Sequence, residues 1–188
     1  AGSLVGALKL LEYRGYDSAG IATLENGQLT RLRAEGKLSN LEARLTTQPL
    51  RGTIGIGHTR WATHGKPTEL NAHPHATDCL AVVHNGIIEN HAELREELMR
   101  DGFKFDSQTD TEVIAHMLER EQQRGAKLFE AVQKVVARLH GAYAIVAISA
   151  REPGVLAGAR LGSPLVVGYG EGENYFGSDV HALIPLTR

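Results

Sequence analysis

The sequence has a single cysteine, Cys79, among 188 residues. One cysteine excludes a framework of intramolecular disulfides and is typical of proteins in a reducing compartment, so we expect a cytoplasmic location. The sequence also lacks any apolar run near the roughly 18 residues that a membrane helix needs, and it lacks the pattern of a signal peptide. We therefore expect no membrane partner.

Neither sign of charge is in large excess, because 20 lysines and arginines stand against 22 aspartates and glutamates. Without a basic block that could neutralise phosphates, we expect no nucleic-acid partner. Apolar residues make up 42% and charged residues 22% of the chain, which is typical of a folded globular protein. No internal repeat or low-complexity linker divides the sequence, so we expect residues 1–188 to form one domain.

Hydrophobic periodicity predicts strands towards both ends of the sequence and helices between them. The expected helices cover residues 3–12, 38–45, 91–101 and 128–140 and a segment that opens at residues 109–112. The expected strands cover residues 18–24, 28–34, 53–59, 79–85, 142–149, 155–160, 164–170 and 174–178. This order predicts an α+β fold with two sheets and helices packed outside them.

Local signals mark a turn and two helix ends. The pair Asn26 and Gly27 predicts a tight hairpin. Asn90 and Thr109 are each followed three residues later by a glutamate, which predicts capping boxes at the start of two helices.

Histidines are concentrated between His58 and His75, on both sides of Trp61, the only tryptophan. A polar, aperiodic segment of this length is usually functional or disordered. The histidine spacings are not those of a metal motif, so hydrogen bonds from the histidines to loop carbonyls are favoured over a metal site. We expect no metal and no cofactor.

Two further clusters each allow a structural and a functional interpretation. Asn85 and Gly86 form the commonest hairpin pair, and taken alone they favour a turn over an oxyanion hole built from the Asn85 amide and the Gly86 N–H. Asp110 stands where a carboxylate stabilises a helix dipole, which is favoured locally, although it could also hold a substrate ammonium. Arg60 could bind a substrate carboxylate or form an ion pair with an aspartate. Arg60 and Asp110 together would suit a free amino acid.

Several longer motifs, read jointly, resemble one family. They are EYRGYDSAG (12–20), TRWATHG with NAHPH (59–75), HNGIIENH (84–91) and TDTEVIAH (109–116). In this order they resemble the glutaminase domain of the glutamine–fructose-6-phosphate aminotransferase family, which belongs to the class II glutamine amidotransferases. The resemblance extends from about Leu4 to the last residue and includes LGSPLVVG and SDVHAL.

The resemblance implies an N-terminal-nucleophile hydrolase fold, in which two antiparallel sheets lie between helical layers. It implies release of ammonia from glutamine through a cysteine thioester, with the α-amine of that first cysteine as general base. The implied partners are L-glutamine, L-glutamate and a sugar-isomerase domain of the full-length enzyme.

The family motifs also assign roles to individual residues. Substrate recognition falls on Arg60, Thr63, His64, His73, Gly86 and Asp110. Arg60 and Asp110 are expected to bind the carboxylate and amine of glutamine, and Asn85 and Gly86 to form the oxyanion hole. Trp61 is expected to gate the passage of ammonia, and Arg14 to lie beside the nucleophile.

The sequence departs from the family at its beginning. Aligned on EYRGYDSAG, Ala1 corresponds to a position about a dozen residues into the family's domain, inside its first helix. The expected preceding segment is a strand of the type Cys-Gly-Ile-Val-Gly that carries the nucleophile. Cys79 lacks a free α-amine and is expected to be a buried thiol. Two hypotheses follow: a glutamine-hydrolysing domain, or a fragment that binds glutamine without turning it over.

Overall fold

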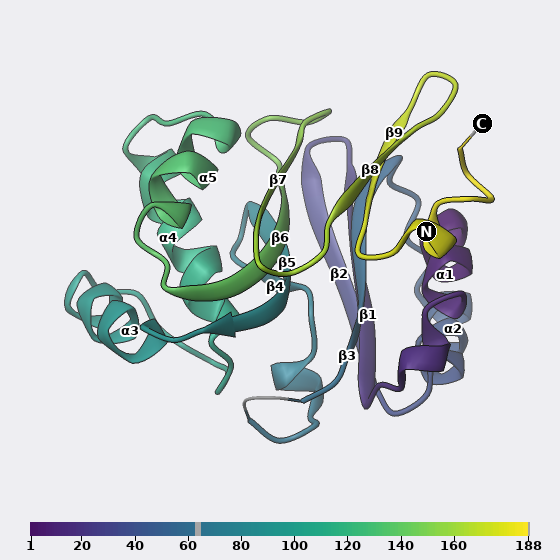
Figure 1. Ribbon diagram of the computed structural model, residues 1–188, viewed down its shortest axis with the longest axis horizontal. Helices are drawn as coiled ribbons and strands as arrows, with labels where there is room; N and C mark the ends of the chain where they lie inside the picture. The colour runs from purple at the N-terminus through teal and green to yellow at the C-terminus, as the bar shows by residue number, and fades with distance from the viewer. Residues whose placement is uncertain (63–64, 188) are drawn as a thin grey trace.

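Two antiparallel sheets lie face to face between two layers of helices (Figure 1). The computed structural model describes residues 1–62 and 65–187. The helices are α1 (Gly2–Lys9), α2 (Leu38–Thr47), α3 (His91–Arg100), α4 (Thr111–Gln123) and α5 (Leu128–Val136). The 3-10 helices are η1 (Glu12–Arg14), η2 (Glu69–Asn71) and η3 (Val180–Ala182). The predicted α+β sandwich is confirmed.

The strands form three sheets. They are β1 (Ser18–Glu25), β2 (Gln28–Glu35), β3 (Ile54–Arg60), β4 (His75–Ala76), β5 (Leu80–Ile88), β6 (Gly141–Ser149), β7 (Leu156–Leu161), β8 (Val166–Tyr169) and β9 (Asn174–Gly177). The first sheet has the order β2-β1-β3 and the second the order β4-β5-β6-β7, while β8 and β9 pair separately. In the described part of the chain, β3 therefore pairs along one edge alone, as does β9.

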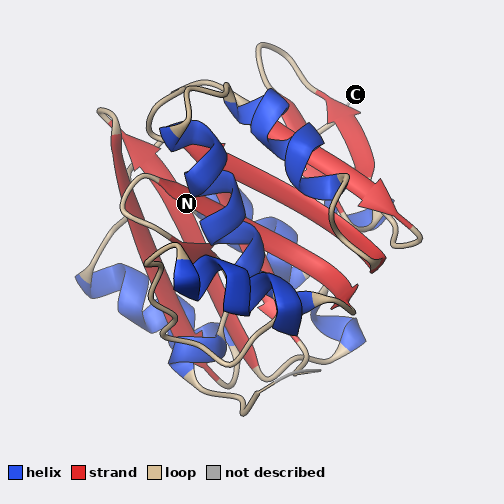
Figure 2. Cartoon of the chain, turned by 90° about the vertical axis from the view of Figure 1, so that its left-hand side faces the viewer, coloured by secondary structure: helices blue, strands red, loops and turns tan. Residues whose placement is uncertain are grey.

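Apolar side chains hold these layers together in three clusters. One lies between α1, α2 and the outer face of the first sheet, and includes Val5, Leu8, Ile21, Leu38 and Leu41. A second lies between the two sheets, and includes Ala22, Leu24, Ile56, Val146 and Ile148. The largest joins the second sheet to α4 and α5, which cover its outer face, and to α3, which packs against α4 (Figure 2).

The hairpin predicted at Asn26 and Gly27 is confirmed, with φ angles of 52° and 75°. Both angles are positive, as the tight turns of two-residue hairpins require. This turn sets the register of β1 against β2, which brings Ser18 opposite Glu35.

The two predicted capping boxes are wrong. Asn90 stands at the N-cap of α3, but its side chain bonds Arg138 O and His140 N at 2.9 Å each. Thr109 hydrogen-bonds His75 instead of capping α4, which begins at Thr111. In both cases the side chain predicted to cap the helix hydrogen-bonds instead to a residue that is distant in the sequence.

Among the helices of residues 1–62 and 65–187, none has the length and the apolar character that a membrane span requires.

Candidate active site

A cavity of about 490 Å³ lies where the first sheet, the second sheet and the β8–β9 pair meet. Consecutive residues of β3 (55–60, continuing into Trp61) and of β9 (174–177, continuing into Ser178) line it. Because successive side chains of a strand point to opposite faces, a cavity that contacts consecutive residues follows the edge of the strand. The cavity thus runs along the free edges of β3 and β9.

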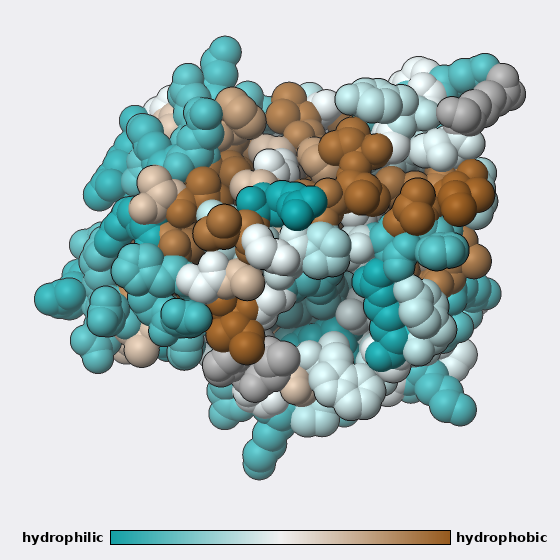
Figure 3. All heavy atoms as spheres, viewed as in Figure 1, coloured by the Kyte–Doolittle hydropathy of each residue, from teal (hydrophilic) through white to brown (hydrophobic). Residues whose placement is uncertain are grey.

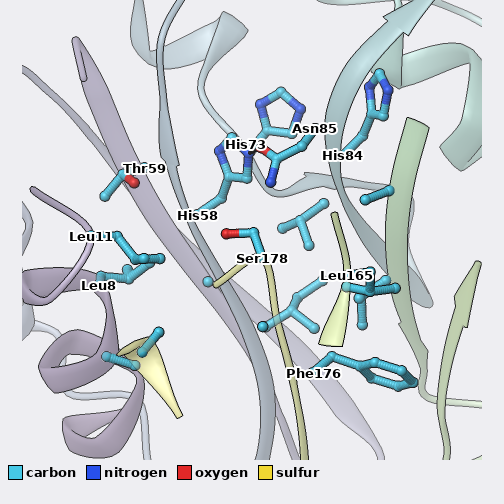
Figure 4. A pocket seen from close by; sticks show the side chains of 18 of the residues that line it. Leu8, Leu11, His58, Thr59, His73, His84, Asn85, Leu165, Phe176 and Ser178 are labelled. Atoms are coloured by element: carbon cyan, nitrogen blue, oxygen red, sulfur yellow. Dashed lines mark hydrogen bonds between the residues drawn. The ribbon is translucent and has the colours of Figure 1, made fainter. Parts of the chain in front are cut away.

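The wall of this cavity is apolar at one end and polar at the other. Leu8 of α1 and Leu11, just after that helix, approach from one side and Leu165 and Phe176 from the far side, whereas the histidines and Asn85 lie together at the opposite end (Figure 4). On the outer surface, Figure 3 shows apolar residues in a band across the upper half of the molecule, with a hollow below the band. The arrangement provides an apolar channel that leads to a small polar site.

Asn85 and Gly86 lie in the middle of a strand, so the hairpin turn that their sequence favours when taken alone is wrong. They pair with Ala144 and Tyr143 of β6. Gly86 has a φ of 120°, and a Cβ atom at this position would lie 2.0 Å from the carbonyl oxygen of Ala142. Only glycine therefore lets β5 pass this close to β6 while it lines the cavity.

His73, His75 and His84 are buried and hydrogen-bond to threonine side chains, where the sequence predicts loop carbonyls as partners. His73 Nε2 and His84 Nδ1 each lie 2.9 Å from Oγ1 of Thr111. His75 Nε2 lies 2.9 Å from Oγ1 of Thr109. Burial lowers the pKa of His73 well below its usual value, and the neighbouring histidines and Arg60 lower it further.

No three His, Cys, Asp or Glu side chains of residues 1–62 and 65–187 are arranged to hold a metal ion. The histidines instead join the start of α4 to β3, β4 and β5, around Thr109 and Thr111.

Arg60, at the end of β3, lies beside an aspartate that the sequence analysis did not single out. Its Nη1 is 4.0 Å from Oδ1 of Asp17, and its side chain is only 4% exposed. The other carboxylate oxygen of Asp17 accepts a 2.6 Å hydrogen bond from the Ala62 N–H. Asp17 therefore holds both the guanidinium of Arg60 and the backbone that follows it.

Asp110 is buried and does not line the cavity, in contrast to Arg60. Its Oδ2 accepts a 2.8 Å hydrogen bond from the Ile88 N–H, which ties the start of α4 to β5. Burial lowers the pKa of Arg60, while the carboxylates of Asp17 and Asp110 oppose that shift. Asp110 is thus close enough to act electrostatically on Arg60 from behind the cavity wall.

Arg14 lines the cavity and is joined to the far end of the chain. Its Nη1 donates to Ser178 Oγ at 2.9 Å and its Nη2 to Asp179 Oδ2 at 2.6 Å. Tyr13 donates to the same Asp179 oxygen at 2.6 Å. Hydrogen bonds from Tyr13, His181 and Arg14 hold the pKa of Asp179 well below its usual range. The carboxylate is therefore ionised and anchors the turn that carries Arg14.

Trp61 follows Arg60 directly and is 67% exposed. Its ring lies across Gly15, where a Cβ atom would come within 2.7 Å of Trp61 Cζ3. The absence of a side chain at Gly15 thus sets the position of the indole at the mouth of the cavity. Thr63 and His64, which the family motif also assigns to substrate recognition, lie outside the described residues.

We predict that Gly15→Ala displaces the Trp61 ring. Because the chain has one tryptophan, acrylamide quenching of its fluorescence reports this ring alone, and we expect more efficient quenching in the variant. Gly172→Ala is the matched control: Gly172 has the same φ of 74° as Gly15, but nothing lies within 4 Å of the added Cβ. Equal quenching in the two variants would contradict the assigned contact.

Cys79 lies directly before β5 and does not line the cavity. Its Sγ donates to Oε2 of Glu119 at 3.0 Å. Burial, together with the hydrogen bond and charge of Glu119, raises the pKa of Cys79 to about 11. The thiol is therefore protonated at neutral pH and is a poor nucleophile.

We predict that iodoacetamide alkylates Cys79 at pH 8 about 100-fold more slowly in the folded chain than in urea, because the thiolate fraction falls with the rise in pKa. Mass spectrometry of timed samples measures the rate. The folded-state rate should rise about tenfold per pH unit up to pH 10. Equal rates in the folded and unfolded chain would contradict the prediction.

Three residues support the site through contacts that the sequence does not predict: His58, Asp17 and Asp179. His58 lies in β3, within the strand expected over residues 53–59, but its 2.8 Å bond to Asn85 has no counterpart in the sequence pattern. Asp17 and Asp179 stood inside quoted motifs without a role. Their partners are 45 and 165 residues away, so spacing carried no signal for them.

Solved structures with the same arrangement place the chain in a class. It aligns with the glutamine phosphoribosylpyrophosphate amidotransferase of B. subtilis, solved with ADP and GMP, at a TM-score of 0.81 and 26% identity, over 97% of this chain and 40% of that one. A structure described as the allosteric regulatory enzyme of purine biosynthesis aligns with a TM-score of 0.82, 26% identity and the same coverage. The fold is that of the N-terminal-nucleophile hydrolase amidotransferases.

The sequence comparisons then give the family. The pattern of the glutamine amidotransferase domain matches residues 58–185, and the chain belongs to this family. It is 61% identical to the glutamine–fructose-6-phosphate aminotransferase (isomerizing) of Mesorhizobium japonicum over 98% of this chain. It is 60% identical to the enzyme of the same name from Bradyrhizobium diazoefficiens over 100% of this chain. The chain spans about 30% of the length of these relatives.

Proposed function

We propose that residues 1–188 belong to a glutamine-hydrolysing domain, which binds L-glutamine in the cavity and releases ammonia and L-glutamate. The observation that carries this proposal is the convergence of Arg14, Arg60, Trp61, His73 and the Asn85–Gly86 pair on one cavity. These residues come from four separate segments of the chain. The family match and the identity to the two aminotransferases support the same reaction.

Arg60 is the proposed ligand of the substrate α-carboxylate, because its planar guanidinium can form two parallel hydrogen bonds with a carboxylate. Asp110 is the proposed counter-charge for the substrate ammonium and acts together with Arg60. Thr63, His64 and His73 are proposed to complete substrate recognition. Because Arg60 and Asp110 are both buried, their interactions with glutamine would be stronger than in water.

The nucleophile is proposed to arrive on an added strand. An extended segment that pairs with the free edge of β3, beside β9, would fill the apolar channel with alternate side chains and satisfy the open edges. Its first residue, a cysteine, would then stand next to Asn85, Gly86 and Arg14.

The reaction follows from this placement. The cysteine Sγ attacks the side-chain amide carbon of glutamine, and the α-amine of the same residue takes the thiol proton. The oxyanion that forms is stabilised by the Asn85 amide and the Gly86 N–H. The C–N bond breaks, the amine returns the proton to the leaving nitrogen, and ammonia leaves past Trp61. Water then hydrolyses the thioester, which yields glutamate and restores the thiol.

The test is to extend the chain at its N-terminal side by about a dozen residues that begin with Cys-Gly-Ile-Val-Gly. We expect glutamate and ammonia in equal amounts from glutamine with the cysteine version. A version that begins with alanine is the matched control and should release at least tenfold less. A folded cysteine version with no release above the control would overturn the proposal, as would equal release by the chain without any extension.

The names of the relatives suggest a wider role. We propose that the ammonia serves the conversion of fructose 6-phosphate to glucosamine 6-phosphate, in the cytoplasm, with a sugar-isomerase domain as partner. The competing function is a module that binds glutamine without turnover. Binding of glutamine by calorimetry together with no hydrolysis in the cysteine-extended chain would favour it.

A further inference from the structure

A single hydrogen bond sets the direction in which the Asn85 amide faces. Its Oδ1 lies 2.8 Å from Nε2 of His58, which stands on β3 in the opposite sheet. An amide oxygen only accepts hydrogen bonds, so the His58 ring donates from Nε2. The nitrogen of the Asn85 amide is left on the side away from His58, where it points towards the cavity (Figure 4).

Two contacts fix the His58 ring in the orientation that this bond needs. The ring lies stacked on that of His73, with centroids 4.3 Å apart and planes inclined by 25°. His73 is held in turn by Thr111, the buried first residue of α4, whose Oγ1 lies 2.9 Å from its Nε2. The direction of the Asn85 amide is thereby connected through two rings to the start of α4.

The charge state of His58 leaves a single N–H for this bond. Burial lowers the pKa of His58 to about 4, although the bond to Asn85 opposes the shift. At neutral pH the ring is therefore neutral and carries one proton, on either Nδ1 or Nε2. The bond to Asn85 requires it on Nε2.

We propose that His58 is a positioning residue that holds the Asn85 amide with its nitrogen towards the cavity. With the amide reversed, its oxygen would face the point where negative charge develops, and repulsion would replace a hydrogen bond. The effect of this orientation on turnover rests on the proposed function, whereas the orientation itself does not.

The orientation is tested on the chain as it stands by ¹⁵N NMR of the histidine rings at pH 7. We expect the His58 proton on Nε2, and we expect Asn85→Ala to release it into a mixture of both tautomers. A His58 ring protonated on Nδ1 in the unchanged chain would overturn the proposal, and so would a tautomer that does not respond to Asn85→Ala.

The positioning role is tested in the cysteine-extended chain with two variants. His58→Phe removes the donor and should lower kcat about 100-fold, with KM changed by less than about threefold, as for the loss of one oxyanion-hole donor. His58→Gln keeps an N–H donor and should recover at least a tenth of the original kcat. Equal kcat values in the two folded variants would overturn the proposal. An inactive unsubstituted chain would count against the proposed function alone, and the tautomer measurement, which needs no substitution at His58, would still decide the orientation.

Discussion

Gly86→Ala lowers the free energy of unfolding by about 4 kcal/mol or more, or abolishes folding. Its Cβ would lie 2.0 Å from the Ala142 carbonyl oxygen, and its φ of 120° is unfavourable for any residue with a side chain. Overpacking usually costs about 1 to 3 kcal/mol. Here the obstacle is the backbone of β6, which cannot move aside without breaking its pairing with β5.

Urea denaturation of the chain, followed by circular dichroism, measures this loss. Gly154→Ala is the matched control, because Gly154 has a φ of 101° but nothing lies within 4 Å of its added Cβ. The control should lose about 1 to 2 kcal/mol from backbone strain alone. A Gly86→Ala variant no less stable than the Gly154→Ala variant would show that β5 and β6 are not this close.

Acid should unfold the chain between pH 6 and pH 4, because three buried histidines stay neutral in the folded state. Burial lowers the pKa of His58 to about 4 and, with opposition from Glu112, that of His75 to about 3. The pKa of His73 is lowered as well. Each becomes protonated near pH 6.5 once the chain unfolds.

The direction in which stability changes with pH follows from the number of protons bound in the folded and unfolded states. Below pH 6.5 these histidines bind protons in the unfolded chain but not in the folded chain. The free energy of unfolding is therefore highest above pH 6.5 and falls as the pH drops towards 4. Each histidine contributes a slope of about 1.4 kcal/mol per pH unit, and the three together about 4. A loss of this size exceeds the stability of many domains.

Denaturant titrations at pH 7, 6, 5.5 and 5 measure how the free energy of unfolding changes with pH. The variant His75→Gln should reduce this slope by about one third, whereas His140→Gln, at an exposed position, should leave it unchanged. A second loss at lower pH belongs to Glu112. Burial opposes its ionisation, but the nearby His116 ring and hydrogen bonds from Ser107 lower its pKa to about 2. Stability that is constant from pH 7 to pH 5 would contradict the assignment of neutral buried histidines.

The same dipeptide shows where sequence reasoning succeeds and where it fails. Asn26-Gly27 predicts a hairpin, and the chain turns there. Asn85-Gly86 carries the same local preference, but it continues β5 because Ala144 and Tyr143 pair with it. Pairing with a strand about 60 residues away overrides a turn preference, and no local pattern reports that pairing.

The strands, the helices and their layers could be predicted because they depend on hydrophobic periodicity, which each segment carries by itself. Among the described residues that the family motifs named, most line one cavity, whereas Asp110 lies behind its wall. The supporting contacts of Asp17, His58 and Asp179 could not be predicted. They join positions that only the folded chain brings together.

The free edge of β3 has a consequence for the handling of the protein. Within the described residues this edge is unpaired, and Gly55 and Gly57 leave it without the charged side chains that commonly protect exposed strands. A second molecule can add its own edge there, in the manner of domain swapping or fibril growth. We therefore expect self-association through β3 to increase with protein concentration, because an unpaired edge is a template for a strand of another molecule.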